Sequence, residues 1–175
     1  MRCVPHRVRH LVLMYGLDLL IVLLAIGAAA TANPERTAVP FPRVQLLLPG
    51  LLGFAGTLIL LAYPEIRDLA DLQVWLVATV SVLIGAVRGS AMKIQSDRSR
   101  RLVRVRRGSD AAWAGWIMVL FAAVQGAIET GLRSENPYET TAEFLMLLAS
   151  GYLLGRSLVA WLRARLAMHH DLLEA

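Results

Sequence analysis

Five apolar segments constrain the fold of this chain more than any other feature. The segment 44–63 has no ionisable side chain except Tyr63. As a helix rising about 1.5 Å per residue, it would span roughly the 30 Å hydrocarbon core of a bilayer. Its apolar residues surround the whole helix, which is typical of a membrane span. We therefore predict an all-α fold, with residues 1–175 forming one bundle of five transmembrane helices. The predicted spans are 11–30, 44–63, 71–92, 111–132 and 142–162.

The first segment has features of a secretory signal peptide. Three arginines precede it, and small residues at 30–32 follow it. Asp18 lies in the middle of the apolar stretch, however, and an ionised carboxylate there costs several kcal/mol to insert. We therefore expect residues 11–30 to be a first span rather than a cleaved leader.

The basic residues predict an orientation in the inner (plasma) membrane of a bacterium. With five spans, the connections 31–43 and 93–110 share one side with the carboxyl terminus. That side carries eleven Lys and Arg residues and the other side five, so it should be cytoplasmic and the amino terminus external. The amino-terminal arginines Arg2, Arg7 and Arg9 favour the opposite orientation. The net charge of +5 is thus attributed to topology rather than to nucleic-acid binding.

The most basic connection, 93–107, predicts a short β-hairpin. Its sequence KIQSDRSRRLVRVRR alternates apolar and basic residues after a turn signal at 96–99. Arg104 and Arg106 would then share one face, within reach of anionic lipid phosphates. The alternatives are arginines that only fix the topology, and a nucleic-acid or protein partner. We expect the bilayer, with its anionic headgroups, to be the partner.

Small residues recur every fourth position in three of the predicted helices. Such rows let two helix backbones approach closely. They predict contacts within one bundle, with a homodimer or another membrane protein as the alternative partner. The rows are Ser81, Gly85 and Gly89; Ala122 and Gly126; and Gly151 and Gly155.

Polar residues within the spans fall into two layers. Asp18, Gln125 and Glu129 lie toward the predicted external side and form a candidate site for a proton, an ion or a polar ligand. The alternative is that they only bond neighbouring helices together. Arg88 and Arg156 lie near the cytoplasmic ends of their helices. They either snorkel to the surface or form a joint site for an anionic headgroup or a carboxylate.

Catalytic, cofactor and metal motifs are not recognisable in the sequence. Cys3, His6 and His10 have a partial metal-ligand spacing but no fourth ligand, so we expect a solvated terminus. His169 and His170 are expected in a solvated tail. We predict no catalytic residue, no cofactor and no metal.

The middle of the chain resembles a known group of membrane proteins. A glycine-rich helix LIGAVRGSAMKI, the turn SDRSRR, the strand LVRVRRGS and a helix ending near Glu129 follow one another. Over about residues 70–160 this order is similar to the CcdC-like and related small bacterial multi-span families. Such families are named by association with cytochrome c biogenesis, and the resemblance implies no defined chemistry and no catalytic residue.

The expected function is that of a non-enzymatic structural, assembly or accessory subunit in the membrane. One alternative is a small transporter or channel component that uses Asp18, Gln125 and Glu129. Another is a membrane-embedded enzyme or binder of anionic lipid that uses Arg88 and Arg156.

Overall fold

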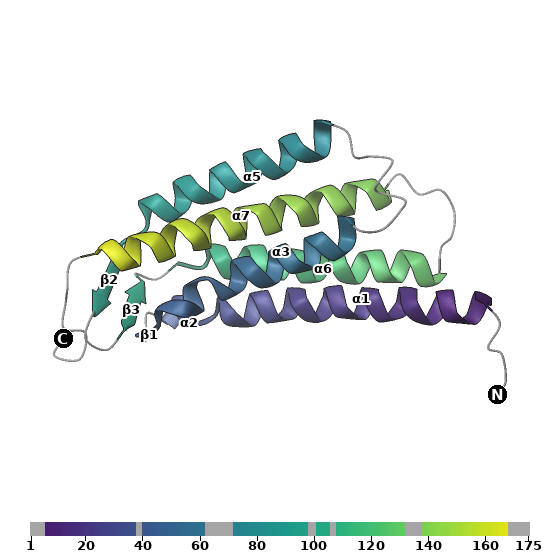
Figure 1. Ribbon diagram of the computed structural model, residues 1–175, viewed down its shortest axis with the longest axis horizontal. Coiled ribbons are helices and arrows are strands. Elements are labelled where there is room, and N and C mark those ends of the chain that lie inside the picture. Colours follow the sequence, from purple (N-terminus) through teal and green to yellow (C-terminus); the bar gives the residue numbers. More distant parts are fainter. Residues whose placement is uncertain are drawn as a thin grey trace.

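Five long helices and a small sheet make up the computed structural model of the chain (Figure 1). It describes residues 6–37, 40–61, 72–97, 101–105, 108–131 and 138–167. A short helix α2 (Pro34–Thr37) and a 3-10 turn η1 (Arg43–Leu46) lie between the first two long helices. The long helices are α1 (His6–Thr31), α3 (Leu48–Leu61), α5 (Leu72–Ala91), α6 (Asp110–Gly131) and α7 (Tyr138–Leu166).

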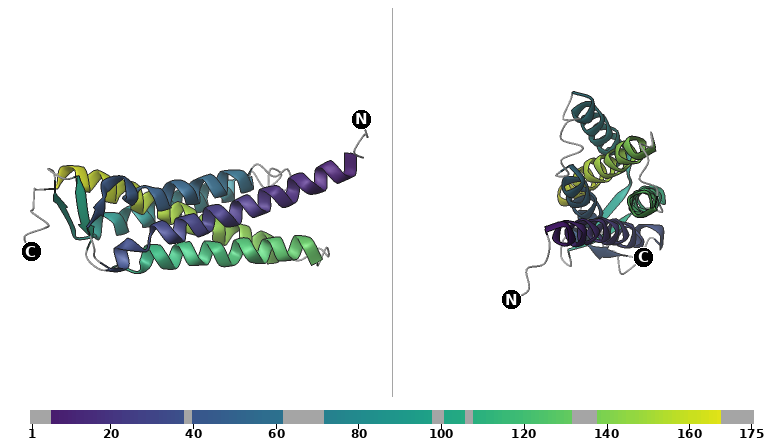
Figure 2. Two further views of the ribbon diagram at one scale, coloured as in Figure 1. Left: turned by 90° about the horizontal axis from the view of Figure 1, so that it is seen from below. Right: turned by 90° about the vertical axis from the view of Figure 1, so that its right-hand side faces the viewer.

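Helix α7 lies at the centre of the bundle and packs against α3, α5 and α6. Helix α1 packs against α3 and α6 on the other side of the bundle. Helix α5 packs chiefly against α7 and therefore lies at one edge, as the view along the bundle in Figure 2 shows. Most of the surface of α5 is left uncovered by the rest of the protein.

The close approach of α5 and α7 depends on their glycines. A Cβ atom at Gly85 would collide with the carbonyl oxygen of Tyr152, and one at Gly155 with that of Val82. Without side chains at these positions the two backbones touch, a packing that is also known from membrane helix pairs with small residues at the interface. The two glycine rows expected from the sequence thus face each other within one chain.

A three-stranded antiparallel sheet closes one end of the bundle (Figure 1). Strands β2 (Ile94–Asp97) and β3 (Leu102–Val105) form the hairpin that the sequence predicts, with Ile94 opposite Val105. The two-residue strand β1 (Phe41–Pro42) pairs with the other edge of β3 and was not expected. The sheet therefore joins the two connections 31–47 and 92–109 at the same end of the bundle.

The five predicted spans correspond to the five long helices, but their bounds differ. The second helix begins at Leu48 rather than at residue 44, because Arg43–Leu46 form a tighter 3-10 turn. Within the described residues, two helical segments are long and apolar enough to cross a membrane by length and composition, Leu72–Ala91 and Phe144–Leu166. Leu19–Thr31, Leu48–Ile59 and Asp110–Val124 are apolar but shorter.

Candidate functional site: a buried charge network

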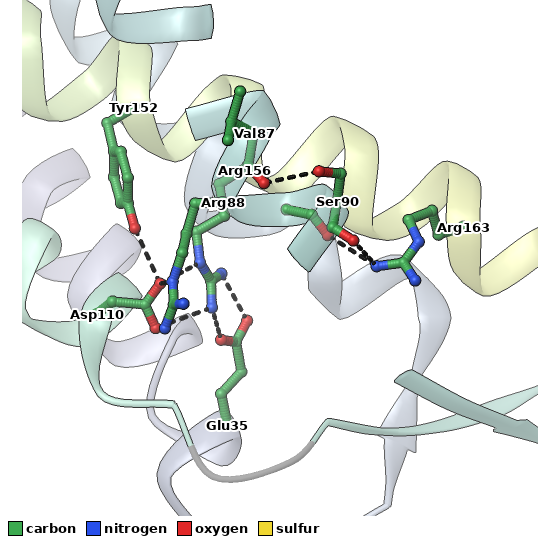
Figure 3. A network of polar contacts seen from close by, with 9 residues as sticks. Glu35, Val87, Arg88, Ser90, Asp110, Tyr152, Arg156 and Arg163 are labelled. Carbon is green, nitrogen blue, oxygen red and sulfur yellow. Dashed lines mark hydrogen bonds and ion pairs between the residues drawn. The ribbon is translucent and has the colours of Figure 1, made fainter. Parts of the chain in front are cut away.

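Charged side chains from four helices meet at the sheet end of the bundle, and Figure 3 shows them left of its centre. Glu35 comes from α2, Arg88 from α5, and Asp110 is the first residue of α6. Tyr152 and Arg156 lie one turn apart on α7. The network therefore joins four separate parts of the chain.

Arg156 and Glu35 form the centre of this network. The guanidinium Nη1 and Nη2 atoms of Arg156 lie 3.2 and 2.5 Å from the two carboxylate oxygens of Glu35, in a bidentate pair. The side chains are 0% and 2% exposed. Charges removed from water to this extent are stable only when they are paired and hydrogen-bonded, as these are.

Asp110 links this pair to α5. Its Oδ2 atom accepts hydrogen bonds from Nε of Arg156 at 2.9 Å, from Nε of Arg88 at 3.0 Å and from the Tyr152 hydroxyl at 2.9 Å. Burial raises the pKa of Asp110, but the charge of Arg156 and the three donors lower it more. The pKa therefore lies well below that of a free aspartate, and Asp110 is ionised.

The local sequence explains how Glu35 reaches the network. Pro34 begins α2, where its missing N–H leaves no helical bond unmade, and Glu35 follows in the first turn. The amide of Gly108 donates a hydrogen bond to the carbonyl of Glu35 at 3.4 Å. This bond ties α2 to the residues directly before Asp110, so the two carboxylates are positioned by neighbouring backbone segments.

Close helix packing positions the two arginines. A Cβ at Gly89 would lie 3.2 Å from Cα of Arg156 and closer still to its carbonyl oxygen, so α5 contacts α7 at the level of the network. Arg88, the residue before this contact, extends toward Asp110 (Figure 3). The charges of two arginines and two carboxylates balance, so the network is neutral as a whole.

A second arginine of α7 holds the end of α5. Nη1 of Arg163 donates to the carbonyl oxygens of Gly89 at 3.2 Å and Met92 at 2.7 Å, and to that of Ser90. The last carbonyls of a helix have no partner within the helix, and a cation there also opposes the negative end of the helix dipole. Arg163 therefore fixes the point at which α5 passes into the sheet.

Arg88 and Arg156, expected to lie at one depth, do meet, but at the carboxylate of Asp110. Arg156 is buried and paired rather than extended to the surface by snorkelling. Arg104 lies on β3 opposite Gln95, and Arg106 falls outside the described residues. A site for an external anion that uses all four arginines stays a prediction.

The predicted external polar site lies in α1 and α6. These helices are antiparallel, and Ala29 of α1 contacts Gly115 of α6. Asp18 precedes Ala29 by eleven residues, and Gly126 follows Gly115 by eleven, so Asp18 and Gln125 lie at similar heights along the pair. The side chains of Asp18, Gln125 and Glu129 fall outside the described part, and this site stays a prediction.

The remaining small residues mostly lie at helix contacts. Ser81 packs against Gly151, and Ala122 is buried in the core with Met118. Gly126 lies in α6, beyond the residues whose surroundings are described. Sequence analysis missed two further close contacts, in which Gly50 packs on α7 and Gly115 packs on α1.

Two members of the network were not expected from the sequence. Glu35 was treated as part of a connection and Tyr152 as an apolar helix residue. Glu35 is the one acid between 31 and 43, on the side predicted for the arginine layer, and this was the available signal. Asp110 was counted as the last residue of the connection 93–110.

Comparisons with protein-family models, curated proteins and solved structures find no match to this chain. The resemblance to CcdC-like proteins therefore stays a prediction. Among the described residues, no group of three or more His, Cys, Asp or Glu side chains is arranged to hold a metal ion. Functional inference consequently depends on the charge network and on the distribution of polar and apolar side chains.

Proposed function

We propose that the chain is an integral, five-span membrane protein that acts as a non-enzymatic structural, assembly or accessory subunit. The observation that supports this most strongly is the inverted distribution of side chains. Large apolar residues are exposed along all five long helices, whereas Arg156, Glu35 and Ser157 are buried. In water, so much exposed apolar surface would cause aggregation, whereas in lipid it is the expected exterior.

Helix α5 gives the clearest example of this distribution. Its buried positions are Val74, Ser81, Gly85 and Gly89, all on the side that packs against α7. Its exposed side is mostly apolar, and Leu83 is 59% exposed, while the polar exposed residues are Gln73, Thr79, Arg88 and Ser90. The exposed apolar residues of α5 are Leu72, Trp75, Leu76, Val80, Leu83, Ile84 and Val87.

The same proposal includes an orientation. The sheet, the carboxyl end of α7 and the charge network lie at one end of the bundle, and α1 begins at the other (Figure 1). Since this end carries Lys93, Arg101 and Arg104 together with Arg163 and Arg165, it is proposed to be cytoplasmic. The amino terminus is then external.

A structural role fits the way the charges are used. All three nitrogens of Arg156 donate to carboxylates of the chain itself, so this group is committed to holding α2, α6 and α7 together. An enzyme or transporter would need comparable groups left open to a substrate. The network is therefore interpreted as a clamp that fixes the end of the bundle.

Three measurements test these proposals. Alkaline carbonate extraction should leave the chain in the membrane pellet, and release into the supernatant would contradict membrane integration. A fluorescent protein fused after residue 100 should fluoresce, because that position is proposed to be cytoplasmic. Alkaline phosphatase fused at the amino terminus should be active, because that end is proposed to be external. In mild detergent the chain should migrate within a larger complex, whereas migration as a single 19.2 kDa chain with detergent would contradict an accessory role.

A further inference from the structure

A strip of α7 remains uncovered between α5 and α6. Leu148 lies one turn before Tyr152, whose hydroxyl reaches Asp110 of α6. It also lies three residues before Gly151, which packs against Ser81 of α5. Leu148 therefore belongs to the side of the central helix that lies between these two neighbours, yet it is 40% exposed.

Apolar side chains of both neighbours flank Leu148. Ile84 lies one turn before Arg88 on the same side of α5, and Ile117 lies two turns after Asp110 on the same side of α6. Both are exposed. Arg88 and Asp110 bond to each other across the strip. Ile84 and Ile117 therefore lie on its two sides, farther from the sheet end.

Arg88 provides a cation at the sheet end of this strip. Its Nε is bonded to Asp110, its side chain is 51% exposed, and its two terminal amino groups have no hydrogen-bond partner within the described part of the chain. Planar amino groups of this kind bind phosphate oxygens in pairs. Arg88 lies one turn before the end of α5, a depth at which lipid headgroups are found.

Tryptophans mark the same depth on α6. Trp113 and Trp116 are exposed and lie within two turns of Asp110, the partner of Arg88. Exposed tryptophans concentrate where headgroups meet acyl chains. An apolar strip with a partly free arginine at headgroup depth matches a phospholipid in polarity and in charge.

We infer that one anionic phospholipid binds along this strip, with its phosphate at Arg88 and an acyl chain against Ile84, Leu148 and Ile117. This inference rests on the proposed function, because the ligand comes from the surrounding bilayer. The ligand is an anionic phospholipid, and it contacts the charge network only at the exposed side of Arg88. Phosphate contacts at Arg88 leave the buried pair of Arg156 and Glu35 intact.

Native mass spectrometry of the detergent-purified chain tests the inference. The probes are phosphatidylglycerol and phosphatidylcholine with identical acyl chains. The wild-type chain should bind one phosphatidylglycerol about tenfold more tightly than phosphatidylcholine, as expected for a charged hydrogen-bonded contact. Arg88→Gln should remove this preference, whereas Arg165→Gln, which removes an exposed cation of α7, should retain it.

A second pair of variants tests the acyl strip without touching a charge. Ile84→Trp should fill the strip and weaken binding of both lipids about tenfold, whereas Leu83→Trp, on a face turned by about 100°, should bind both like the wild type. Equal affinities for the two lipids, a preference that survives Arg88→Gln, or unchanged binding by Ile84→Trp would each overturn the site. Failure of the proposed function would appear differently, as a chain that stays soluble without detergent.

Discussion

Arg156 and Glu35 form a bidentate ion pair between residues 121 positions apart in the sequence, and neither side chain is accessible to any appreciable extent. This pair connects the short helix that follows the first long helix to the last helix of the bundle. A buried cation held by two carboxylates thus joins α2, α6 and α7 at the sheet end of the bundle. Substitutions there should reveal how far the bundle depends on it.

Arg156→Met should destabilise the chain strongly. It leaves the carboxylate of Glu35 buried without its partner, a change that typically costs about 3–5 kcal/mol. Thermal unfolding in detergent should shift accordingly. Arg165→Gln, which removes an arginine that stacks on Trp161 at the surface, should cost about 1 kcal/mol or less. Equal losses of stability in the two variants would mean that the burial of Arg156 makes no difference.

Removing both partners should cost less than the two single substitutions together. Glu35→Gln and Arg156→Met each leave an unpaired group, but the double variant leaves no buried charge between them. A double-mutant cycle should give a coupling of about 1–3 kcal/mol. Additive losses would mean that the two side chains stabilise the chain independently.

Gly85→Ala should separate α5 from α7. The added methyl group meets the backbone of Tyr152 rather than a flexible side chain, so a loss of about 1–3 kcal/mol is expected from overpacking. Gly16→Ala is the matched control, because nothing lies within 4 Å of a Cβ at Gly16. That variant should be neutral or more stable by up to about 1 kcal/mol, since alanine favours helix more than glycine does.

Acid should weaken the network through Asp110. Burial raises its pKa, but Arg156, Arg88 and Tyr152 lower it more, and the folded-state pKa lies below the unfolded value of about 3.9. The stabilisation that ionised Asp110 gives to the folded state is therefore fully present above about pH 4, and it is lost as the pH falls further toward the folded-state pKa. Unfolding temperatures from pH 7 to pH 3 should show this decline, and Asp110→Asn should reduce it. An unchanged decline in that variant would assign the effect to other groups.

Long apolar segments and the alternation within the basic connection were sufficient to predict the five helices and the hairpin. The prediction succeeded because long apolar segments and the alternation of Leu102 to Val105 are local patterns. Strand β1 was missed because two residues carry no alternation, and Pro42 lacks the N–H that a strand uses for pairing. The predicted start of the second helix at residue 44 was wrong, because apolar composition does not distinguish an α-helix from a 3-10 turn.

The candidate site was predictable only in part. Depth along the helices placed Arg88 and Arg156 in one layer, and both contact Asp110. Depth alone does not identify a partner, and the pairing of Glu35 with Arg156 depends on how α2 folds back over the bundle end. A contact of this sequence separation carries no local signal, so only the three-dimensional arrangement reveals it.

The most direct test of the central proposal, that the outer faces of the helices contact lipid, is spin-label accessibility on α5. In a Cys3→Ser background, labels at Leu83→Cys and Lys93→Cys compare an exposed apolar position with the exposed residue after the helix. In lipid vesicles, the label at 83 should collide readily with oxygen and little with a water-soluble nickel chelate, and the label at 93 should show the reverse. Ready access of the nickel chelate to position 83 would contradict a lipid-facing α5.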